Sequence, residues 1–363
     1  MIGTRGIPNQ YGGYEAALQE LAPRLSALGH RVVVYCSHHQ TFKETNWKGV
    51  ELTFHYNPED KLGSAGQFIY DLNCNLHARK QHFDVVLHLG YTSDSVWHRL
   101  WSPGAKHISN MDGMEWMRSK YSPRVRKFLK KAEKWAALRS DLLIADSTGV
   151  FEYLKKKYPT PIGMIAYGAE VPHQFKLNHL TSYGLNAFEY DLLIARMETE
   201  NNIEMAMEAK IDSGNTVPLV VFGNENKYAE KLKEKYKAHP VIKFFRANYN
   251  PDELNSLRYY SRYYIHGHSV GGTNPSLLEA MAAQCRILAH NNIFNTGVLQ
   301  GGGQYFSDAA QLSRFFNLTN TELISNRQIE DNLESIRSNY SWEQICQQYE
   351  AAFYQVLLGV LHR

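Results

Sequence analysis

Residues 265–283 read IHGHSVGGTNPSLLEAMAA, and this stretch says most about the fold. It passes from a strand-like run into a loop of small and hydroxylated residues, and then into an apolar helical pattern. Pro275 suits the first turn of that helix, because a backbone N–H there would have no helical partner. A loop of this kind can offer free backbone N–H groups to phosphates.

The same stretch supplies candidate ligand-binding groups. The hydroxyls of Thr273 and Ser276 can donate to phosphate oxygens, and Glu279, one turn into the helix, can accept hydrogen bonds from a ribose hydroxyl. The candidate residues are Gly271, Gly272, Thr273, Asn274, Ser276 and Glu279. The alternative is a glycine-rich turn before an ordinary helix.

Short apolar runs alternate with helical patterns along the whole chain, which predicts parallel βαβ units and an α/β fold. The strand candidates of the first half are 31–36, 50–56, 83–89, 106–111, 141–147 and 162–167. Those of the second half are 190–195, 218–223, 241–245, 262–266, 286–290 and 304–306. Two consecutive series of this kind require two sheets, so we expect two domains.

Residues 168–187 contain Pro172 and little periodicity, and we expect them to link a domain of residues 1–167 to one of residues 188–340. Residues 341–363 form a predicted C-terminal helix. Its apolar residues recur at helical spacing, at Ile345, Tyr349, Phe353, Val356 and Val360. This helix either packs on its own domain or crosses back to the first one.

The N-terminus is unusual, because only Met1 and Ile2 precede a glycine-rich turn that normally follows a complete buried strand. We therefore expect the first strand to be truncated here, and the natural start to lie upstream of Met1.

Composition narrows the class of protein. The 363 residues are 44% apolar and 21% charged, as in a soluble globular protein, and the net charge of +3 favours no particular partner. No apolar run is long enough for a transmembrane helix, and no secretory signal opens the chain. The four cysteines are far apart and lack zinc-site spacing, so we expect reduced, packed thiols in a cytoplasmic protein.

Residues 3–15, GTRGIPNQYGGYE, form a second candidate segment. The adjacent Gly12 and Gly13 precede a helical stripe, so the backbone there can approach an anionic ligand closely. A plain surface turn explains the same glycines equally well.

Two further segments follow predicted strands, where open α/β sheets bind their ligands. Residues 110–116, NMDGMEW, place Asp112 and Glu115 where they can hold sugar hydroxyls, unless they are a turn residue and an early-helix acid. Arg196 follows the first strand of the second domain, and its bidentate fork suits a diphosphate. A salt-bridged surface arginine is the alternative. Arg196, Asp112 and Glu115 are the candidate catalytic residues.

Taken together, these segments resemble the retaining family-4 glycosyltransferases, in particular a bacterial branch that opens with GTRGIP-x-x-YGG-[FY]-E and contains rhamnosyltransferases of capsule and cell-wall synthesis. The segments NMDGMEW, ARMETENNIE and YSWEQICQQYEAAF are also similar to that branch. The resemblance implies a GT-B fold, in which two Rossmann-like domains face each other across a cleft. It also implies a hexosyltransferase that uses a nucleotide-sugar as substrate and needs no cofactor.

The family's donor site carries over residue by residue, with two departures. The resemblance implies that Gly12 and Gly13 approach the diphosphate from the first domain, that Arg196 meets it from the second, and that Glu279 holds the ribose. The first of two family glutamates falls on Gly271, so one sugar contact is either absent or supplied elsewhere. A family lysine falls on Asn201, which leaves one cation fewer on the phosphates.

A departing diphosphate needs either a divalent metal or fixed positive charges to stabilise it. Metal-dependent enzymes commonly use an Asp-x-Asp pair, and no two aspartates of this chain are two residues apart. We therefore expect metal-independent transfer that relies on Arg196 and on the helix that starts near Ser276. The family implies retention of anomeric configuration.

Two rival functions remain. A nucleotide-sugar epimerase would need a compact acid/base set, which only His266 and His268 suggest. A non-catalytic nucleotide- or nucleic-acid-binding module is disfavoured, because the chain lacks G-x-G-x-x-G and an interleaved basic and aromatic face. We expect no nucleic-acid partner.

The resemblance implies dTDP-L-rhamnose as the donor and a lipid-linked saccharide as the acceptor, with a UDP-hexose as the alternative donor. A membrane surface is also expected. We expect a helix over residues 122–139, and between Arg118 and Arg139 the chain has nine Lys/Arg residues and one acid, Glu133. Val125, Phe128, Leu129, Ala132 and Trp135 form the expected buried stripe of this helix. The cations should then face an anionic membrane at its inner leaflet, or else solvent.

Overall fold

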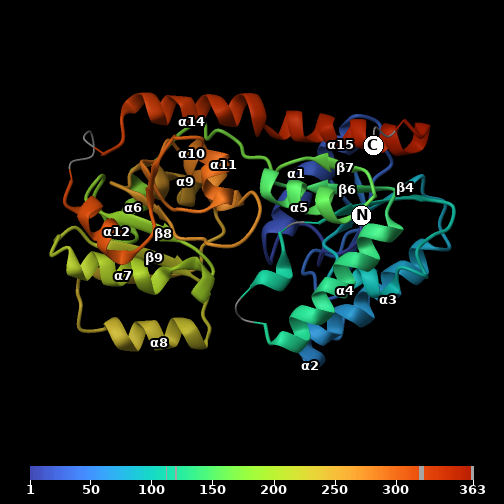
Figure 1. Ribbon diagram of the computed structural model, residues 1–363, viewed down its shortest axis with the longest axis horizontal. Helices are drawn as coiled ribbons and strands as arrows, with labels where there is room; N and C mark the ends of the chain where they lie inside the picture. The colour runs from blue at the N-terminus through green and yellow to red at the C-terminus, as the bar shows by residue number, and fades with distance from the viewer. Residues whose placement is uncertain (112, 119–120, 319–322, 361–363) are drawn as a thin grey trace. The chain divides into compact units, whose positions relative to one another are not determined.

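The computed structural model of the protein describes residues 1–111, 113–118, 121–318 and 323–360. The chain divides into two compact units, one made of Met1–Tyr167 and Trp342–Arg363 and the other of Gly168–Ser341 (Figure 1). Each unit has its own sheet and its own apolar core. Within the described residues, no helix is long and apolar enough to cross a membrane.

The sheet of the first unit is mainly parallel. Its strands are β1 (Val33–Ser37), β2 (Asn46–Trp47), β3 (Val50–His55), β4 (Val85–Leu89), β5 (Lys106–Asn110), β6 (Leu142–Ala145) and β7 (Ile162–Met164). They form the groups β1-β3-β2 and β4-β5-β6-β7, in which β2 pairs antiparallel with β3. Ile2 lies between the two groups: its N–H donates to the Leu87 carbonyl, and its own carbonyl accepts from Leu89. The Met1 carbonyl accepts from the Tyr35 N–H on the other side, so the N-terminal residues complete the sheet.

Helices cover both faces of this sheet. They are α1 (Gly13–Ala27), α2 (Glu59–Leu62), α3 (Gly66–Ala78), α4 (Pro123–Arg139), α5 (Thr148–Lys157) and α15 (Trp342–Leu358), with 3-10 turns η1 (Gly63–Ala65), η2 (Asp94–Trp97) and η3 (Glu115–Met117). Leu18 of α1 and Ile345 of α15 share one core with the sheet, and Figure 1 shows these two helices side by side. Tyr70 of α3 packs in the core of the opposite face, with Ile2.

The sheet of the second unit is parallel throughout its described strands. These are β8 (Asp191–Ile194), β9 (Leu219–Gly223), β10 (Ile242–Arg246), β11 (Tyr264–His266), β12 (Ile287–His290) and β13 (Gln304–Phe306). Their spatial order is β10-β9-β8-β11-β12-β13, which is the Rossmann order, with the first and fourth strands side by side. The order reverses between β8 and β11, so a ligand is expected at the carboxyl ends of these two strands.

The helices of the second unit form two layers. They are α6 (Asn178–Thr181), α7 (Ile203–Asp212), α8 (Lys227–Tyr236), α9 (Pro251–Tyr259), α10 (Pro275–Ala282), α11 (Ile293–Leu299), α12 (Ala309–Phe316) and α14 (Asn326–Asn339), with the turn η4 (Thr199–Asn201). Tyr263 and Ile265 share a core with α7, α8 and α12. Because strand side chains alternate, Tyr264 and His266 face the opposite side, where the Tyr264 hydroxyl shares a hydrogen bond with Ser276 of α10.

The expected α/β fold is confirmed, and each strand range expected from the sequence overlaps an observed strand, although β2 was not expected. The predicted helix after Ser122 is α4, and Ser122 is its N-cap. The prediction of buried apolar stripes is wrong for two residues. Val125 lies in the first turn of α4 and is 39% exposed, and Val360 lies beyond the end of α15 and is 55% exposed.

Acid pH should destabilise the first unit through its buried His107. Burial, followed by the neighbouring His88, lowers the pKa of His107 to about 4 from 6.5. The unfolded chain therefore binds a proton near pH 6.5 that the folded chain binds only near pH 4. The free energy of unfolding should fall between these values as pH drops, by up to about 1.4 kcal/mol per pH unit.

Urea unfolding at several pH values between 4 and 7 measures this dependence. In His107→Gln, the free energy of unfolding should change much less between pH 6.5 and pH 4 than in the unaltered protein. His82→Gln, at an exposed histidine, is the matched control and should keep the original pH dependence. An unchanged slope in His107→Gln would show that this imidazole is not the group that titrates.

Candidate functional site

The glycine-rich loop after β11 ends in a capped helix start. Asn274 is the N-cap of α10, and its side-chain oxygen accepts the Ser276 N–H at 2.9 Å, while Pro275 occupies the first turn. Gly271 has a φ of +145°, and an added Cβ there would meet no atom within 4 Å. The loop thus has open space beside its backbone, so a ligand can approach without a side chain in the way.

The two hydroxyls predicted to bind phosphate are placed differently. Thr273 is 4% exposed, so its side chain is covered by the protein. The Ser276 hydroxyl lies 2.6 Å from the hydroxyl of the buried Tyr264 and shares a hydrogen bond with it. Since a hydroxyl both donates and accepts, Ser276 keeps capacity for a further hydrogen bond.

The turn that carries Arg196 contacts this loop. Its turn follows β8, and the turn continues into η4, where the Glu200 carbonyl accepts from both the N–H and the hydroxyl of Ser269. Asn202 also donates to the Gly267 carbonyl at 2.8 Å. The structure therefore brings together the Arg196 turn and the glycine-rich loop, at the carboxyl ends of the neighbouring strands β8 and β11.

The Arg196 side chain is exposed, and within the described residues it makes no ion pair. The expected alternative of a salt-bridged surface arginine therefore does not apply. Asn201, where the resembled family has a lysine, is buried and donates to the Arg196 carbonyl at 2.7 Å. Asn201 thus supports the turn that carries Arg196 instead of adding a second charge.

Glu279 lies in the second turn of α10, with its side chain 44% exposed. It forms an ion pair with Arg258 of α9, whose side chain is 2% exposed. Sequence reasoning missed Arg258, because an arginine in an amphipathic helical pattern has no feature that marks it as buried.

His266 and His268 stack at the end of β11, with ring centroids 4.4 Å apart and planes at 14°. Burial, followed by the neighbouring His268, holds the pKa of His266 well below its usual value, so its imidazole is neutral. Neither ring nitrogen of His266 has a hydrogen-bond partner within the described part of the chain. A neutral, buried imidazole is poorly suited to the acid/base role that an epimerase would require.

In the first unit, Gly12 is the N-cap of α1 and Gly13 is its first residue. The first turn also contains Glu15, which is buried and accepts the Arg5 N–H at 2.8 Å. A Cβ on Gly12 would lie 3.6 Å from a carboxylate oxygen of Glu15. This negative charge already interacts with the positive end of the helix, so α1 attracts a diphosphate less than a bare N-terminus would.

Of the acidic pair predicted near residue 112, Glu115 lies in η3 after β5 and forms an ion pair with Arg118 at 2.6 Å. Its N–H donates to the Tyr91 hydroxyl at 3.3 Å. Asp112 lies outside the described residues. Glu115 is thus at the carboxyl edge of the first sheet, as the sequence pattern implies, but its carboxylate is engaged by a cation.

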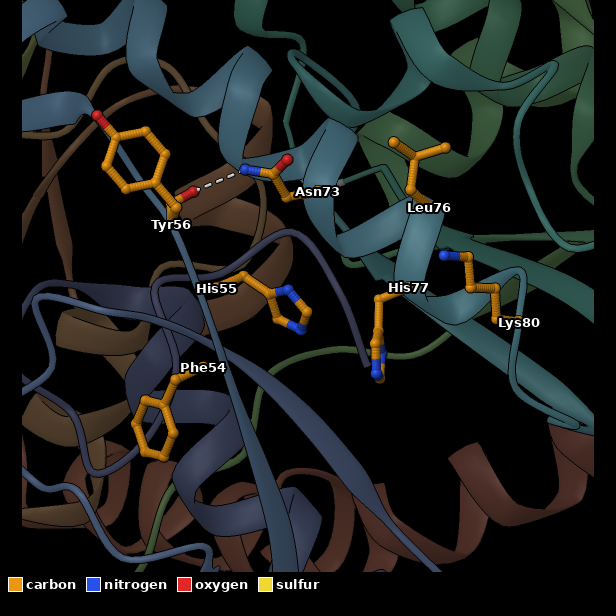
Figure 2. Close-up of a pocket in the computed structure, with 7 residues that line it drawn as sticks. All are labelled: Phe54, His55, Tyr56, Asn73, Leu76, His77 and Lys80. Atoms are coloured by element: carbon orange, nitrogen blue, oxygen red, sulfur yellow. Dashed lines mark hydrogen bonds between the residues drawn. The ribbon is translucent and has the colours of Figure 1, made fainter.

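A surface hollow of about 480 Å³ lies elsewhere in the first unit, between β3 and α3 (Figure 2). Its lining residues are Phe54, His55, Tyr56, Asn73, Leu76, His77 and Lys80. The His55 and His77 rings are 4.9 Å apart, and burial lowers the pKa of His55 to about 4. None of the predicted site residues lines this hollow, so it is separate from the candidate site.

Among the described residues, no group of three or more His, Cys, Asp or Glu residues is arranged to hold a metal ion.

A family model described as a domain of unknown function, DUF1972, matches residues 1–170. No curated protein is similar enough to the chain to match it.

Solved structures resemble the chain over nearly its whole length. The sucrose-phosphate synthase of Thermosynechococcus elongatus has a TM-score of 0.75 at 14% identity, over 96% of this chain and 94% of that one. Anabaena HepE, solved in complex with UDP, has a TM-score of 0.74 at 12% identity, over 96% and 98%. A glycosyltransferase from Rickettsia africae has a TM-score of 0.71 at 14% identity, over 97% of each chain. With the Rossmann strand order of the second unit, these likenesses show that the chain has a GT-B fold of two Rossmann-like domains.

Proposed function

We propose that the protein is a glycosyltransferase that takes its sugar from a nucleotide-sugar donor. The observation that carries the proposal is the exposed Arg196, which makes no ion pair within the described residues and lies on a turn that is hydrogen-bonded to the glycine-rich loop leading into α10. An exposed arginine on a turn that contacts a glycine-rich loop, at the point where the strand order reverses, suits a diphosphate. The fold likeness to a sucrose-phosphate synthase and to a UDP-bound protein supports the same reading.

The proposed chemistry is transfer with retention of anomeric configuration. As the bond from the sugar to the diphosphate breaks, negative charge grows on the leaving phosphate. Arg196 and the N-terminal end of α10 stabilise that charge, and Glu279 accepts hydrogen bonds from the ribose. The departing phosphate takes the acceptor's proton, so no separate base is required.

The enzyme should work without a divalent metal, because the chain lacks an Asp-x-Asp pair and relies on fixed positive charge. Transfer rates should stay within about twofold when EDTA is added to the purified protein. Loss of transfer in EDTA and its recovery with Mn²⁺ or Mg²⁺ would show that a metal, not Arg196, carries the leaving charge.

For the donor we propose dTDP-L-rhamnose. A 6-deoxy sugar has a methyl group where glucose has a hydroxyl, so its pocket needs fewer polar contacts. Gly271 stands where the resembled family has a glutamate, and open space lies beside it. A UDP-hexose is the second candidate. It is favoured by the fold likeness to HepE, which is 12% identical to this chain and was solved in complex with UDP-glucose.

A donor panel tests the proposal, with release of the nucleoside diphosphate as the readout. We expect turnover of dTDP-rhamnose ahead of UDP-glucose, UDP-galactose, UDP-N-acetylglucosamine and GDP-mannose. A UDP- or GDP-sugar that is turned over more than about tenfold faster, a difference of about 1.4 kcal/mol, would replace rhamnose as the donor while leaving the transferase proposal intact.

The acceptor we propose is a saccharide on a lipid carrier, reached at an anionic membrane surface by the exposed face of α4. Arg124, Lys127, Lys131 and Lys134 are exposed and recur every three or four residues, so they share one side of the helix. The single acid of the helix, Glu133, is 2% exposed and points inward. The outward face therefore carries positive charge without a compensating acid.

Vesicles that contain anionic phosphatidylglycerol should bind the protein at low salt and release it at about 0.5 M NaCl, because salt then limits the attraction between charges to a few ångströms. Lys131→Gln/Lys134→Gln should weaken binding roughly 30-fold, since each cation contributes on the order of 1 kcal/mol. The matched control is Lys227→Gln/Lys231→Gln, which removes two exposed cations from α8. Equal loss in both variants would reject α4 as the contact, and no binding by the unaltered protein would reject the membrane.

A further inference from the structure

Arg258 of α9 is a charged group in the interior of the second unit, with a side chain that is 2% exposed. One guanidinium nitrogen, Nη1, donates to the side chain of Asn255 at 3.2 Å. A second, Nη2, donates to Oε2 of Glu279 on α10 and completes an ion pair. The pair joins a buried cation to a carboxylate whose side chain is 44% exposed.

A buried guanidinium is costly for a protein to keep, because desolvation opposes it and apolar substitutes often pack as stably. Burial by itself lowers the pKa of Arg258, but the carboxylate of Glu279, together with Tyr264 and Cys285, outweighs that effect, so the pKa is raised overall. Arg258 thus stays charged and holds one carboxylate oxygen of Glu279 in place. Apolar side chains could pack α9 against α10 equally well, so helix packing alone does not explain the buried charge of Arg258.

The other carboxylate oxygen of Glu279, Oε1, has no hydrogen-bond partner within the described residues. Glu279 lies one turn after the N-cap Asn274, on the helix that the glycine-rich loop enters. A carboxylate with one oxygen anchored and the other open can accept hydrogen bonds from hydroxyls in one fixed direction.

We infer that Arg258 is a positioning residue that holds the carboxylate of Glu279 ready to accept the ribose hydroxyls of the nucleotide. The inference rests on the proposed function, since it assigns a further residue to the same donor site. Arg258 itself should not touch the nucleotide, because its side chain is 2% exposed whereas that of Glu279 is 44% exposed. Its effect should therefore depend on whether the nucleotide has ribose hydroxyls.

Equilibrium binding of two matched probes separates this role from a purely structural one. The probes are dTDP and 2′,3′-dideoxythymidine diphosphate, which differ in the 3′-hydroxyl, with UDP and its 2′,3′-dideoxy analogue as a second pair. The unaltered protein should prefer the hydroxylated probe of at least one pair by about tenfold or more, as expected for hydrogen bonds to a charged group.

In Arg258→Met the hydroxylated probe should bind at most about threefold more tightly than its dideoxy partner. The change should come from weaker binding of the hydroxylated probe alone. Arg258→Lys keeps the charge without the fork and should retain part of the preference. Arg262→Met is the matched control. Arg262 forms an ion pair with the buried Asp191, at the start of β8, away from the glycine-rich loop. It should leave the preference unchanged.

A full preference that persists in Arg258→Met would overturn the inference alone. Equal loss for both probes would show a structural ion pair and would also overturn it. If Arg258→Met does not fold, as judged by circular dichroism, Arg258→Lys decides: an undiminished preference overturns the inference. If the unaltered protein binds none of the four diphosphates, the proposed function fails first and the inference falls with it.

Discussion

Arg196→Ala should lower kcat by about a hundredfold to a thousandfold, the usual effect of removing one group that stabilises charge in a transition state. The side chain is exposed, and within the described residues it makes no ion pair, so its removal should leave the fold intact. The loss should appear in kcat and kcat/KM alike, because the charge on the leaving phosphate grows as the bond breaks.

Two further variants make the Arg196 result specific. Arg196→Lys keeps the positive charge but loses the bidentate fork, so its kcat should lie between those of the alanine variant and the unaltered protein. Arg246→Ala removes another exposed arginine from the second unit, at the end of β10, and should change kcat less than twofold. Near-native turnover in Arg196→Ala would mean that the diphosphate binds elsewhere.

Glu133→Ala should destabilise the first unit by about 3–5 kcal/mol, because a buried donor that loses its acceptor costs about 1–3 kcal/mol and several donors share this carboxylate. The carboxylate is 2% exposed and accepts hydrogen bonds from four donors, with distances of 2.7 to 2.9 Å. The donors are Trp116, Tyr153, Lys157 and Tyr158. Loss of the carboxylate would leave polar groups of η3, of α5 and of Tyr158, directly after α5, without their shared acceptor.

Urea unfolding followed by far-ultraviolet circular dichroism measures the Glu133 effect. The control is Glu152→Ala, which removes an exposed acid from α5 and should stay within about 0.5 kcal/mol of the unaltered protein. A loss below about 1 kcal/mol in Glu133→Ala would mean that water replaces the carboxylate at little cost.

Much of the fold could be predicted from local pattern. The alternation of apolar runs and helical stripes is enough to identify a parallel strand such as β11 or β12, since a buried strand must be apolar on both faces. Helix starts were also predictable where the chain carries a capping residue, as Asn274 and Ser122 show. Two-residue strands such as β2 have no period to detect.

The environment of charged groups could not be predicted in the same way. Glu133 lies among lysines and arginines in sequence, yet it points into the protein because donors from η3 and α5 converge on it. The sequence pattern suggests that Arg258 lies on the exposed face of an amphipathic helix, but its side chain is buried and paired with Glu279 of α10. In both cases the partner is distant in the chain, so tertiary packing decides which face is covered.

The most direct test of the account is transfer itself, measured with purified protein, a nucleotide-sugar carrying a labelled sugar, and a lipid-linked saccharide acceptor. The account predicts that labelled glycolipid and free nucleoside diphosphate appear in equal amounts, and that neither forms in Arg196→Ala at more than about one hundredth of the unaltered rate. An isomerised nucleotide-sugar with no free diphosphate, or no turnover of any donor in the panel, would contradict it.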